Sequence, residues 1–365
     1  MSSDVLESRF PKLSLWTSGD EKPTFKQLEK FAQATHAPLG YLLLTEPPSE
    51  ELPVADYRTI ANTPLGKPSA NLFETIYLCE QRQDWYREFA RTSGDAPIPF
   101  VGSLSESLDP TSAAETMREL LGFGLAERSQ FRSWTDAVSR LSENAEDAGV
   151  LVMISGVVGS DNHRRLDPEE FRGFSLVDEY APTIFINGAD TKAAQIFTLA
   201  HELAHLWLGQ SAVSDIDPAR STTNITERWC NQVAAEFLVP GELLSEGGLD
   251  LGNLTEDLER LARRFKVSTL VALRRVFDAG MLARDRYQSA YEEELQRVKD
   301  LTEQREGGGG DFYKTQPARV GKRFARALIE STLEGHTLHR DAFQMLGFKK
   351  HATFVELAHR LGVVQ

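Results

Sequence analysis

The stretch that most constrains this chain is residues 191–209, TKAAQIFTLAHELAHLWLG, which contains the sequence His-Glu-Leu-Ala-His. Apolar residues dominate it, no proline interrupts it, and Gly209 is a helix-ending residue, so the pattern predicts a buried helix. Residues four apart lie on one face of a helix, so His201 and His205 can bind the same metal ion. Glu202, one residue further round, can reach a water molecule beside that metal and is the predicted general base.

A catalytic zinc ion needs a third protein ligand and keeps a fourth position for water. Glu227 is the favoured third ligand, because it starts a new predicted helix after His205. Asn231 lies four residues further on, on the same helix face, and is expected to support a ligand histidine from behind through a hydrogen bond. Glu236 is the rival ligand. It lies about two and a half turns from Glu227, so both carboxylates cannot face one metal from a straight helix.

The chain has two cysteines, Cys79 and Cys230, which excludes a disulfide framework and a cysteine-based zinc site. Histidines and carboxylates must therefore hold any metal, and the predicted cofactor is Zn²⁺. In such a site Glu202 would take a proton from the attacking water and pass it to the leaving amine. His163 and Tyr180 are the residue types available as a further donor to the oxyanion. Their alternative interpretations are a loop histidine and a partly buried tyrosine.

The fold class predicted from periodicity is α+β, a mostly helical chain with a small three-stranded sheet beside the HExxH helix. Residues 150–158 and 183–186 are apolar and β-branched, which indicates buried strands, and residues 171–176 indicate a strand at the sheet edge. An edge strand beside a metal can hold an extended peptide through main-chain hydrogen bonds. Residues 211–223 are expected to be a polar loop. Helices are predicted over residues 5–10, 13–16, 24–35, 71–92, 112–121, 133–148, 227–238, 254–265, 268–279 and 284–306.

Domain boundaries are indicated by a proline-rich polar connector at residues 46–58 and by four consecutive glycines, Gly307–Gly310. The segment after the glycines has nine Lys or Arg against five Asp or Glu, a balance of 9 − 5 = +4. It is expected to face the acidic body of the same chain, an acidic partner or nucleic acid. The predicted segments are a helical N-terminal module at residues 1–50, a helical connector at 51–145, a peptidase core at 146–283, a charged helix and glycine linker at 284–310, and a basic helical C-terminal module at 311–365.

The net charge of −14 argues against a nucleic-acid-binding or anionic-membrane-binding surface over the whole protein. No apolar run approaches the roughly 18 residues that a membrane-spanning helix needs, and the first residues lack the pattern of a signal peptide. A cytoplasmic protein without a membrane partner is therefore expected.

Residues 16–29 resemble the second half of a lambda-repressor-type (XRE) helix-turn-helix domain, with a Trp-Thr-Ser-Gly turn followed by a capped helix start. A complete domain of that family has a further helix before the point where this chain starts, so residues 1–50 are expected to be a partial helix-turn-helix. A helical remnant that packs on the rest of the protein is the alternative. DNA binding by this segment stays open.

Two stretches, FTLAHELAHLWLG and ERWCNQVAAEFLVP, resemble the ImmA/IrrE (DUF955) metallopeptidase family. The family pattern is HExxH followed by Glu-x-x-Ala-Asn and a Leu-Met-Pro-like ending. The resemblance covers residues 145–280 and departs from the pattern at Cys230, for alanine, and Val239, for methionine. It implies a gluzincin-like core in which zinc is held by residues 201, 205 and 227, with the glutamate at 202 as general base.

The resemblance also implies a substrate class. Family members are similar to regulatory endopeptidases that cut a helix-turn-helix repressor or an antitoxin, and so control phage, mobile-element or stress genes. A site-specific zinc endopeptidase is the expected function. The alternative is a DNA- or toxin-binding transcriptional regulator or antitoxin that uses the peptidase fold for recognition.

Overall fold

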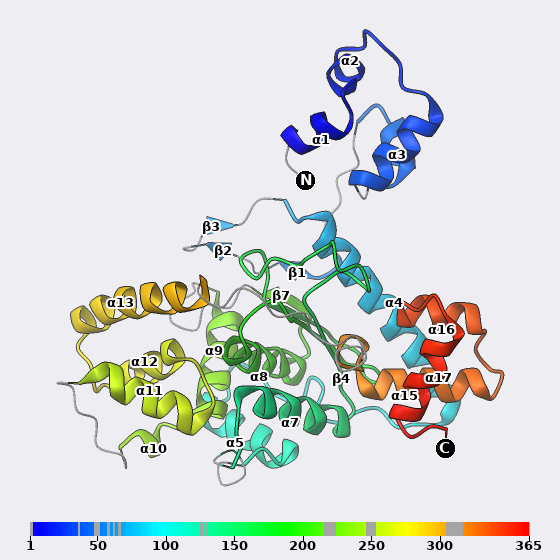
Figure 1. Ribbon diagram of the computed structural model, residues 1–365. Coiled ribbons are helices and arrows are strands. Elements are labelled where there is room, and N and C mark those ends of the chain that lie inside the picture. The colour runs from blue at the N-terminus through cyan, green and yellow to red at the C-terminus, as the bar shows by residue number, and fades with distance from the viewer. Residues whose placement is uncertain are drawn as a thin grey trace. The chain divides into compact units, whose positions relative to one another are not determined.

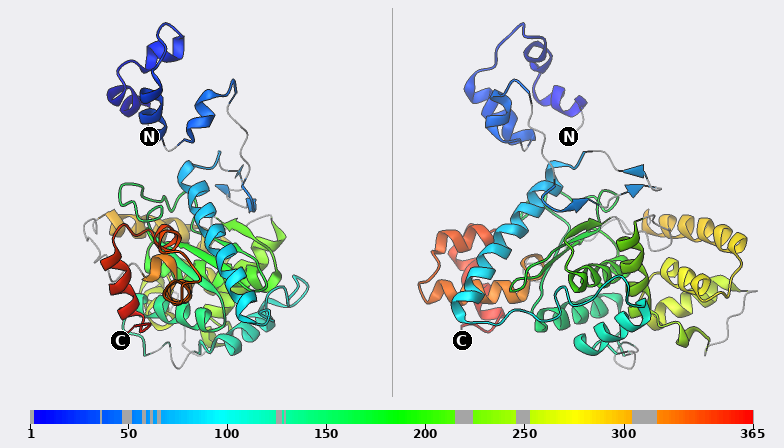
Figure 2. Two further views of the ribbon diagram at one scale, coloured as in Figure 1. Left: turned by 90° about the vertical axis from the view of Figure 1, so that its right-hand side faces the viewer. Right: turned by 180° about the vertical axis from the view of Figure 1, so that it is seen from behind.

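The computed structural model divides into two units, Met1–Pro53 and Val54–Gln365, which are described separately (Figures 1 and 2). Helices predominate and accompany a small mixed sheet, which confirms the predicted α+β class. None of the helices in the described part of the chain combines the length and the apolar character of a membrane-spanning segment. The described residues are 3–35, 37–46, 52–56, 59–60, 63–64, 67–124, 128, 130–214, 224–245, 253–303 and 317–364.

The first unit is a cluster of short helices with a small core. The rings of Phe10 and Phe31 meet edge to face at 5.3 Å, and Gly19 closes a helix in the left-handed region at φ 82°. The helices lie where the sequence predicts them, and the relationship to helix-turn-helix domains stays a prediction. The elements are α1 (Ser3–Arg9), α2 (Leu13–Ser18), α3 (Phe25–Thr35) and the 3₁₀-helix η1 (Leu39–Leu43).

A five-stranded sheet organises the second unit, with the strand order β1-β7-β5-β6-β4. The outer pairs β4–β6 and β1–β7 are parallel, and β5 runs antiparallel to both of its neighbours. A separate two-stranded hairpin is formed by β2 (Thr59–Ile60) and β3 (Thr63–Pro64). The strands of the main sheet are β1 (Ala55–Asp56), β4 (Leu151–Ser155), β5 (Gly173–Leu176), β6 (Thr183–Asn187) and β7 (Ala212–Ser214).

Two expectations about the sheet were wrong. The sheet has five strands instead of three, because β1 forms within the predicted connector and β7 within the predicted polar loop. The strand expected at the edge, β5, is an interior strand, because β7 pairs along its outer side. Strands of two or three residues are too short for an alternation of apolar and polar residues to be recognised in the sequence. In the structure, Ala212 and Val213 of β7 are both fully buried.

Helices cover the sheet and build the main core. The HExxH helix α8 packs on β5 and β6, α7 packs on α8 and β4, and α9 packs on α8 (Figure 1). Large buried side chains such as Phe197 and Trp207 fill the space between these elements. The helices are α4 (Ala70–Ser93), α5 (Pro110–Leu121), α7 (Trp134–Asp147), α8 (Lys192–Leu208), α9 (Ile225–Leu238), α10 (Glu242–Ser245), α11 (Leu254–Phe265), α12 (Thr269–Asp278) and α13 (Arg284–Glu303).

The basic C-terminal module packs against the body of the same chain. Helix α15 (Lys322–Leu333) contacts α4 and β4 and is followed by α16 (His339–Leu346) and α17 (His351–Arg360). Lys322 pairs with Glu143 at 2.7 Å, so part of the positive charge faces acidic groups of the body, as one of the three alternatives predicted. The predicted glycine linker, Gly307–Gly310, lies outside the described residues.

Candidate metal centre

Helix α8 carries the HExxH residues in a buried position. The Thr191 hydroxyl caps its first turn by accepting a hydrogen bond from the Ala194 amide, and Gly209 ends it in the left-handed region at φ 72°. His201, Glu202 and His205 are all fully buried, although each carries a polar side chain. Polar groups in such positions need partners or ligands to offset the loss of water.

Helix α9 brings a carboxylate to the two histidines. Its cap, Asn224, accepts a hydrogen bond from the Glu227 amide through Oδ1 at 3.1 Å, which places Glu227 in the first helical turn. The positive end of the helix dipole favours a negative side chain there. Because α9 packs on α8, this carboxylate reaches the face of α8 that carries both imidazoles.

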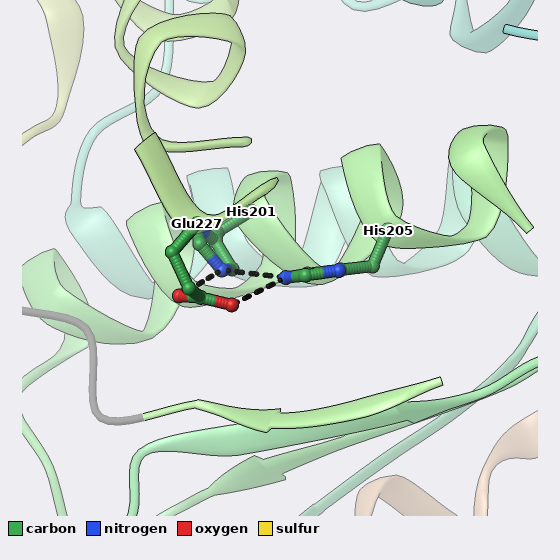
Figure 3. A group of neighbouring side chains, drawn as sticks. All are labelled: His201, His205 and Glu227. Carbon is green, nitrogen blue, oxygen red and sulfur yellow. Dashed lines mark hydrogen bonds and ion pairs between the residues drawn. The ribbon is translucent and has the colours of Figure 1, made fainter. Parts of the chain in front are cut away.

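The three predicted ligands converge on one point (Figure 3). The Nε2 atoms of His201 and His205 are 3.0 Å apart, and Glu227 places Oε1 3.0 Å from His205 Nε2 and Oε2 3.4 Å from His201 Nε2. In a tetrahedral zinc site with bonds of roughly 2.0–2.1 Å, ligand atoms are separated by about 3.3 Å. The side chains therefore fit one small metal ion without rearrangement.

The electrostatics of Glu227 also suit a ligand. Burial raises the pKa of its carboxyl, but the adjacent His201 and His205 lower it more through charge and hydrogen bonding. The net result is a pKa well below the usual range, so Glu227 is an anion at neutral pH. The Ser214 hydroxyl, at the end of β7, donates a further hydrogen bond to its Oε1 at 3.4 Å.

The pKa of Glu202 is shifted in the opposite direction. Burial raises the pKa of its carboxyl to about 8, with a lowering contribution from His205, a raising one from Glu227, and lowering ones from the hydroxyls of Ser175 and Ser214. Neither carboxyl oxygen has a hydrogen bond within the described residues that satisfies normal geometry. Such a carboxyl holds a proton readily near neutral pH, as a group that shuttles protons must.

The floor beneath Glu202 is β5, and Gly173 makes room for the carboxyl. A Cβ atom at Gly173 would lie 2.6 Å from Thr198 Cγ2 and 3.3 Å from Glu202 Oε1. A side chain at this position would therefore displace α8 from the sheet. Sequence reasoning did not identify Gly173, Ser175 or Ser214, because their relation to α8 arises only when β5 and β7 pair.

The rival ligand, Glu236, has another role. Its carboxylate forms an ion pair with Arg275 and accepts a hydrogen bond from the Gly241 amide at 3.1 Å. Asn231 is half-buried, and its Oδ1 has no hydrogen-bond partner in the described part of the chain. Its support of a ligand histidine stays a prediction.

The two predicted oxyanion donors lie in other surroundings. His163 is exposed in the loop that follows β4, where its amide donates to Asp161. Tyr180 lies in the turn between β5 and β6, under the guanidinium of Arg91 at 5.1 Å. Among the described contacts, neither residue touches the three converging ligands, and their catalytic role stays a prediction.

Both thiols are buried in the core. Burial raises the pKa of Cys79 to about 12 and raises that of Cys230 well above its ordinary value. A thiol protonated in this way is a poor metal ligand and a poor nucleophile. The centre is therefore a nitrogen and oxygen site.

Comparison with known families agrees with this geometry. Residues 145–277 match the family model Peptidase_M78, described as an IrrE N-terminal-like domain. Residues 320–360 match a second family model, described as a domain of unknown function, DUF8813. A search of curated proteins found no match. The first match spans all three converging ligands and Glu202, and the second spans most of the C-terminal module.

Proposed function

Because residues 145–277 form a domain of the IrrE N-terminal-like peptidase family, we propose that the chain is a zinc-dependent endopeptidase that cleaves one regulatory protein. The observation that supports this best is the convergence of two imidazoles and a carboxylate around a single point, beside a buried carboxyl of raised pKa. Two histidines and a glutamate with no thiolate are a ligand set typical of catalytic zinc.

The residues at this centre have two roles, metal binding and proton transfer. His201, His205 and Glu227 would hold a zinc ion, which would act there as a Lewis acid toward water and a peptide carbonyl. Glu202 accepts the proton of the attacking water on a carboxyl oxygen and then donates it to the leaving amine nitrogen. A carboxyl whose pKa lies near the working pH can do both.

The sheet edge nearest the centre is the natural place for an extended substrate. Strand β7 ends at Ser214, which contacts Glu227, and β1 pairs along the outer side of β7. A substrate segment that adds to this edge has to replace β1 or pair beyond it. β1 is two residues long, so its pairing is weak enough to be exchanged.

The proposed substrate is a helix-turn-helix repressor or an antitoxin. This class comes from the family resemblance of the motifs, and the small helical unit at Met1–Pro53 is compatible with an origin in such regulators. The proteins encoded next to the chain's own gene are the first substrates to test.

The decisive variant is Glu202→Gln, which keeps the size and removes the base. We expect it to bind one equivalent of zinc, measured by elemental analysis, and to cleave the substrate about 10²- to 10⁴-fold more slowly than the parent protein. Glu169→Gln makes the same chemical change at an exposed site and should cleave normally. Full cleavage by Glu202→Gln would exclude the proposed mechanism.

The alternative function is a DNA- or toxin-binding regulator, and the charge of the N-terminal unit argues against its DNA-binding form. Residues 1–53 contain five Lys or Arg against eight Asp or Glu, a balance of 5 − 8 = −3. DNA binding relies on cationic contacts to phosphates. A gel-retardation assay at moderate salt tests it, and sequence-specific binding by Glu202→Gln with full biological activity would favour the regulator over the peptidase.

A further inference from the structure

A cavity of about 840 Å³ lies apart from the metal centre, between α7, β4, the start of α8 and residues 317–322. Its volume is in the range of about 300–1,000 Å³ that small-molecule sites occupy. Lys192 lines the cavity and lies nine residues before His201, which is roughly 13 Å along α8. The cavity is therefore a separate site, and one of its walls comes from the C-terminal module.

Three cations line this cavity without a carboxylate partner in the described part of the chain, namely Arg165, Lys192 and Arg319. Lys192 Nζ donates to the neutral amide of Gln195 at 2.7 Å, and Arg319 Nη2 donates to Asn162 at 3.4 Å. Arg319 Nη1 is buried and has no hydrogen-bond partner among the residues that the structure describes. Partial burial lowers the pKa of both Lys192 and Arg319, which means that their charges lack compensation by the protein.

The acidic groups near these cations are already engaged. Glu143 pairs with Lys322 at 2.7 Å, and Glu146 accepts a hydrogen bond from the Arg323 amide at 3.1 Å. Asp190, beside the start of α8, accepts from the Thr191 amide and pairs with Arg172. The uncompensated charge of the cavity is therefore positive, which favours an anionic ligand.

The backbone gives one end of the cavity its shape. Strands β4 and β6 are parallel, and their carboxyl ends lead into Gly156 and Gly188, which both line the cavity. A Cβ atom at Gly188 would lie 2.9 Å from the Gly156 amide nitrogen, so the two backbones approach as only glycine allows. The loop after β6 then opens helix α8. The amides of this turn already donate within the chain, from Gly188 to the Ser155 carbonyl at 2.9 Å and from Ala189 to Asn187 Oδ1 at 3.0 Å. The side-chain cations, and not the backbone amides, are therefore the groups that would hold an anion.

The remaining lining indicates that the ligand is larger than a bare anion. Val138, Val152 and Ile154 give the cavity an apolar side, and Val152 is only 3% exposed. The recess reaches the core strand β4, which a flat nucleic-acid backbone would not enter. We propose that this cavity binds a small molecule that carries a phosphate group on an apolar or aromatic body.

Calorimetric titration of the full chain with ATP and with inorganic pyrophosphate tests the site. We expect the parent protein to bind ATP, and Lys192→Gln and Arg319→Gln each to weaken binding by about tenfold or more, as the loss of one charge-assisted hydrogen bond implies. Lys192 belongs to the catalytic domain and Arg319 to the C-terminal module, so parallel effects show a shared site. Arg340→Gln, a neutralisation at an exposed position in the same module, should change affinity less than twofold.

Thermal melting of each variant separates lost binding from lost folding, and Lys192→Gln is informative even if Arg319→Gln unfolds. ATP binding at the same affinity by both site variants, or no heat with either probe at millimolar concentration, would overturn the proposal. Preferential binding of duplex DNA that Lys192→Gln weakens would identify a nucleic-acid surface instead. The inference does not depend on peptidase activity, so Glu202→Gln should bind ATP as the parent protein does.

Discussion

The contact between Glu146 and the C-terminal module makes stability depend on pH in a predictable direction. Glu146 lies near the end of α7, is 8% exposed, and accepts a hydrogen bond from the first turn of α15 through the Arg323 amide. Burial raises the pKa of its carboxyl to about 7, with smaller lowering contributions from the amides and charges of Lys322 and Arg323. Replacing Glu146 by Gln removes the ionisation while keeping the oxygen that accepts the hydrogen bond.

The sign follows from the two pKa values. The unfolded carboxyl titrates near 4.5 and the folded one near 7, so the folded state holds the proton more tightly between these pH values. The contribution of this contact to the free energy of unfolding is therefore fully present below pH 4.5 and is lost as pH rises toward 7. A difference of about 2.5 pKa units corresponds to roughly 3 kcal/mol. Glu146→Gln should accordingly exceed the parent protein in stability above pH 7 and match it near pH 4.5.

Hydrogen exchange of peptides from α15 measures this locally. After correction for intrinsic exchange, protection in Glu146→Gln should exceed that of the parent protein by a few-fold at pH 5 and on the order of 10²-fold at pH 8. Glu143→Gln, on the same helix, breaks the partly exposed pair with Lys322. It should lower the protection of α15 slightly, by an amount that corresponds to less than about 1 kcal/mol of local stability. Equal protection in Glu146→Gln and the parent protein at pH 8 would refute the reasoning.

Three further predictions concern the centre and its floor. Glu227→Gln should reduce zinc occupancy by at least about tenfold on dialysis against a weak chelator, because a charged ligand is lost, and unchanged occupancy would remove it from the ligand set. Gly173→Ala should lower stability by about 1–3 kcal/mol and slow cleavage, because its Cβ would lie 2.6 Å from Thr198 Cγ2; a normal melting temperature would contradict this contact. Ala55→Pro should speed cleavage if β1 competes with substrate for β7, and slower cleavage would show that β1 supports the site.

The helices that carry the centre are predictable because their signals are local. Thr191 and Gly209 bound α8, the i, i+4 spacing places both histidines on one face, and a capped helix start lies beside Glu227. Each of these features extends over a few residues and needs no tertiary information. The α+β class follows in the same way from the apolar runs of β4 and β6.

The sheet order is not local, and that is where sequence reasoning was wrong. β5 alternates like an edge strand, but it is interior because a three-residue strand from beyond α8 pairs with it. The contact of Gly173 with α8 and the cavity shared with residues 317–322 have the same origin, since they join segments far apart in the chain. Pairing energies of very short strands depend on what the folded core places beside them.

Two buried glutamates, Glu236 and Glu202, differ in whether neighbouring groups compensate their charge. Glu236 is 8% exposed and fully compensated by Arg275 and the Gly241 amide, as expected for a charge that only stabilises the fold. Glu202 is fully buried, neither of its carboxyl oxygens has a hydrogen-bond partner among the described residues, and β5 leaves space for it through a glycine. An apolar residue of similar size at this position would pack at lower cost. A carboxyl in this state beside three converging ligands suits the proton transfer that we propose for Glu202, because that role needs a group that can take up and release a proton near neutral pH.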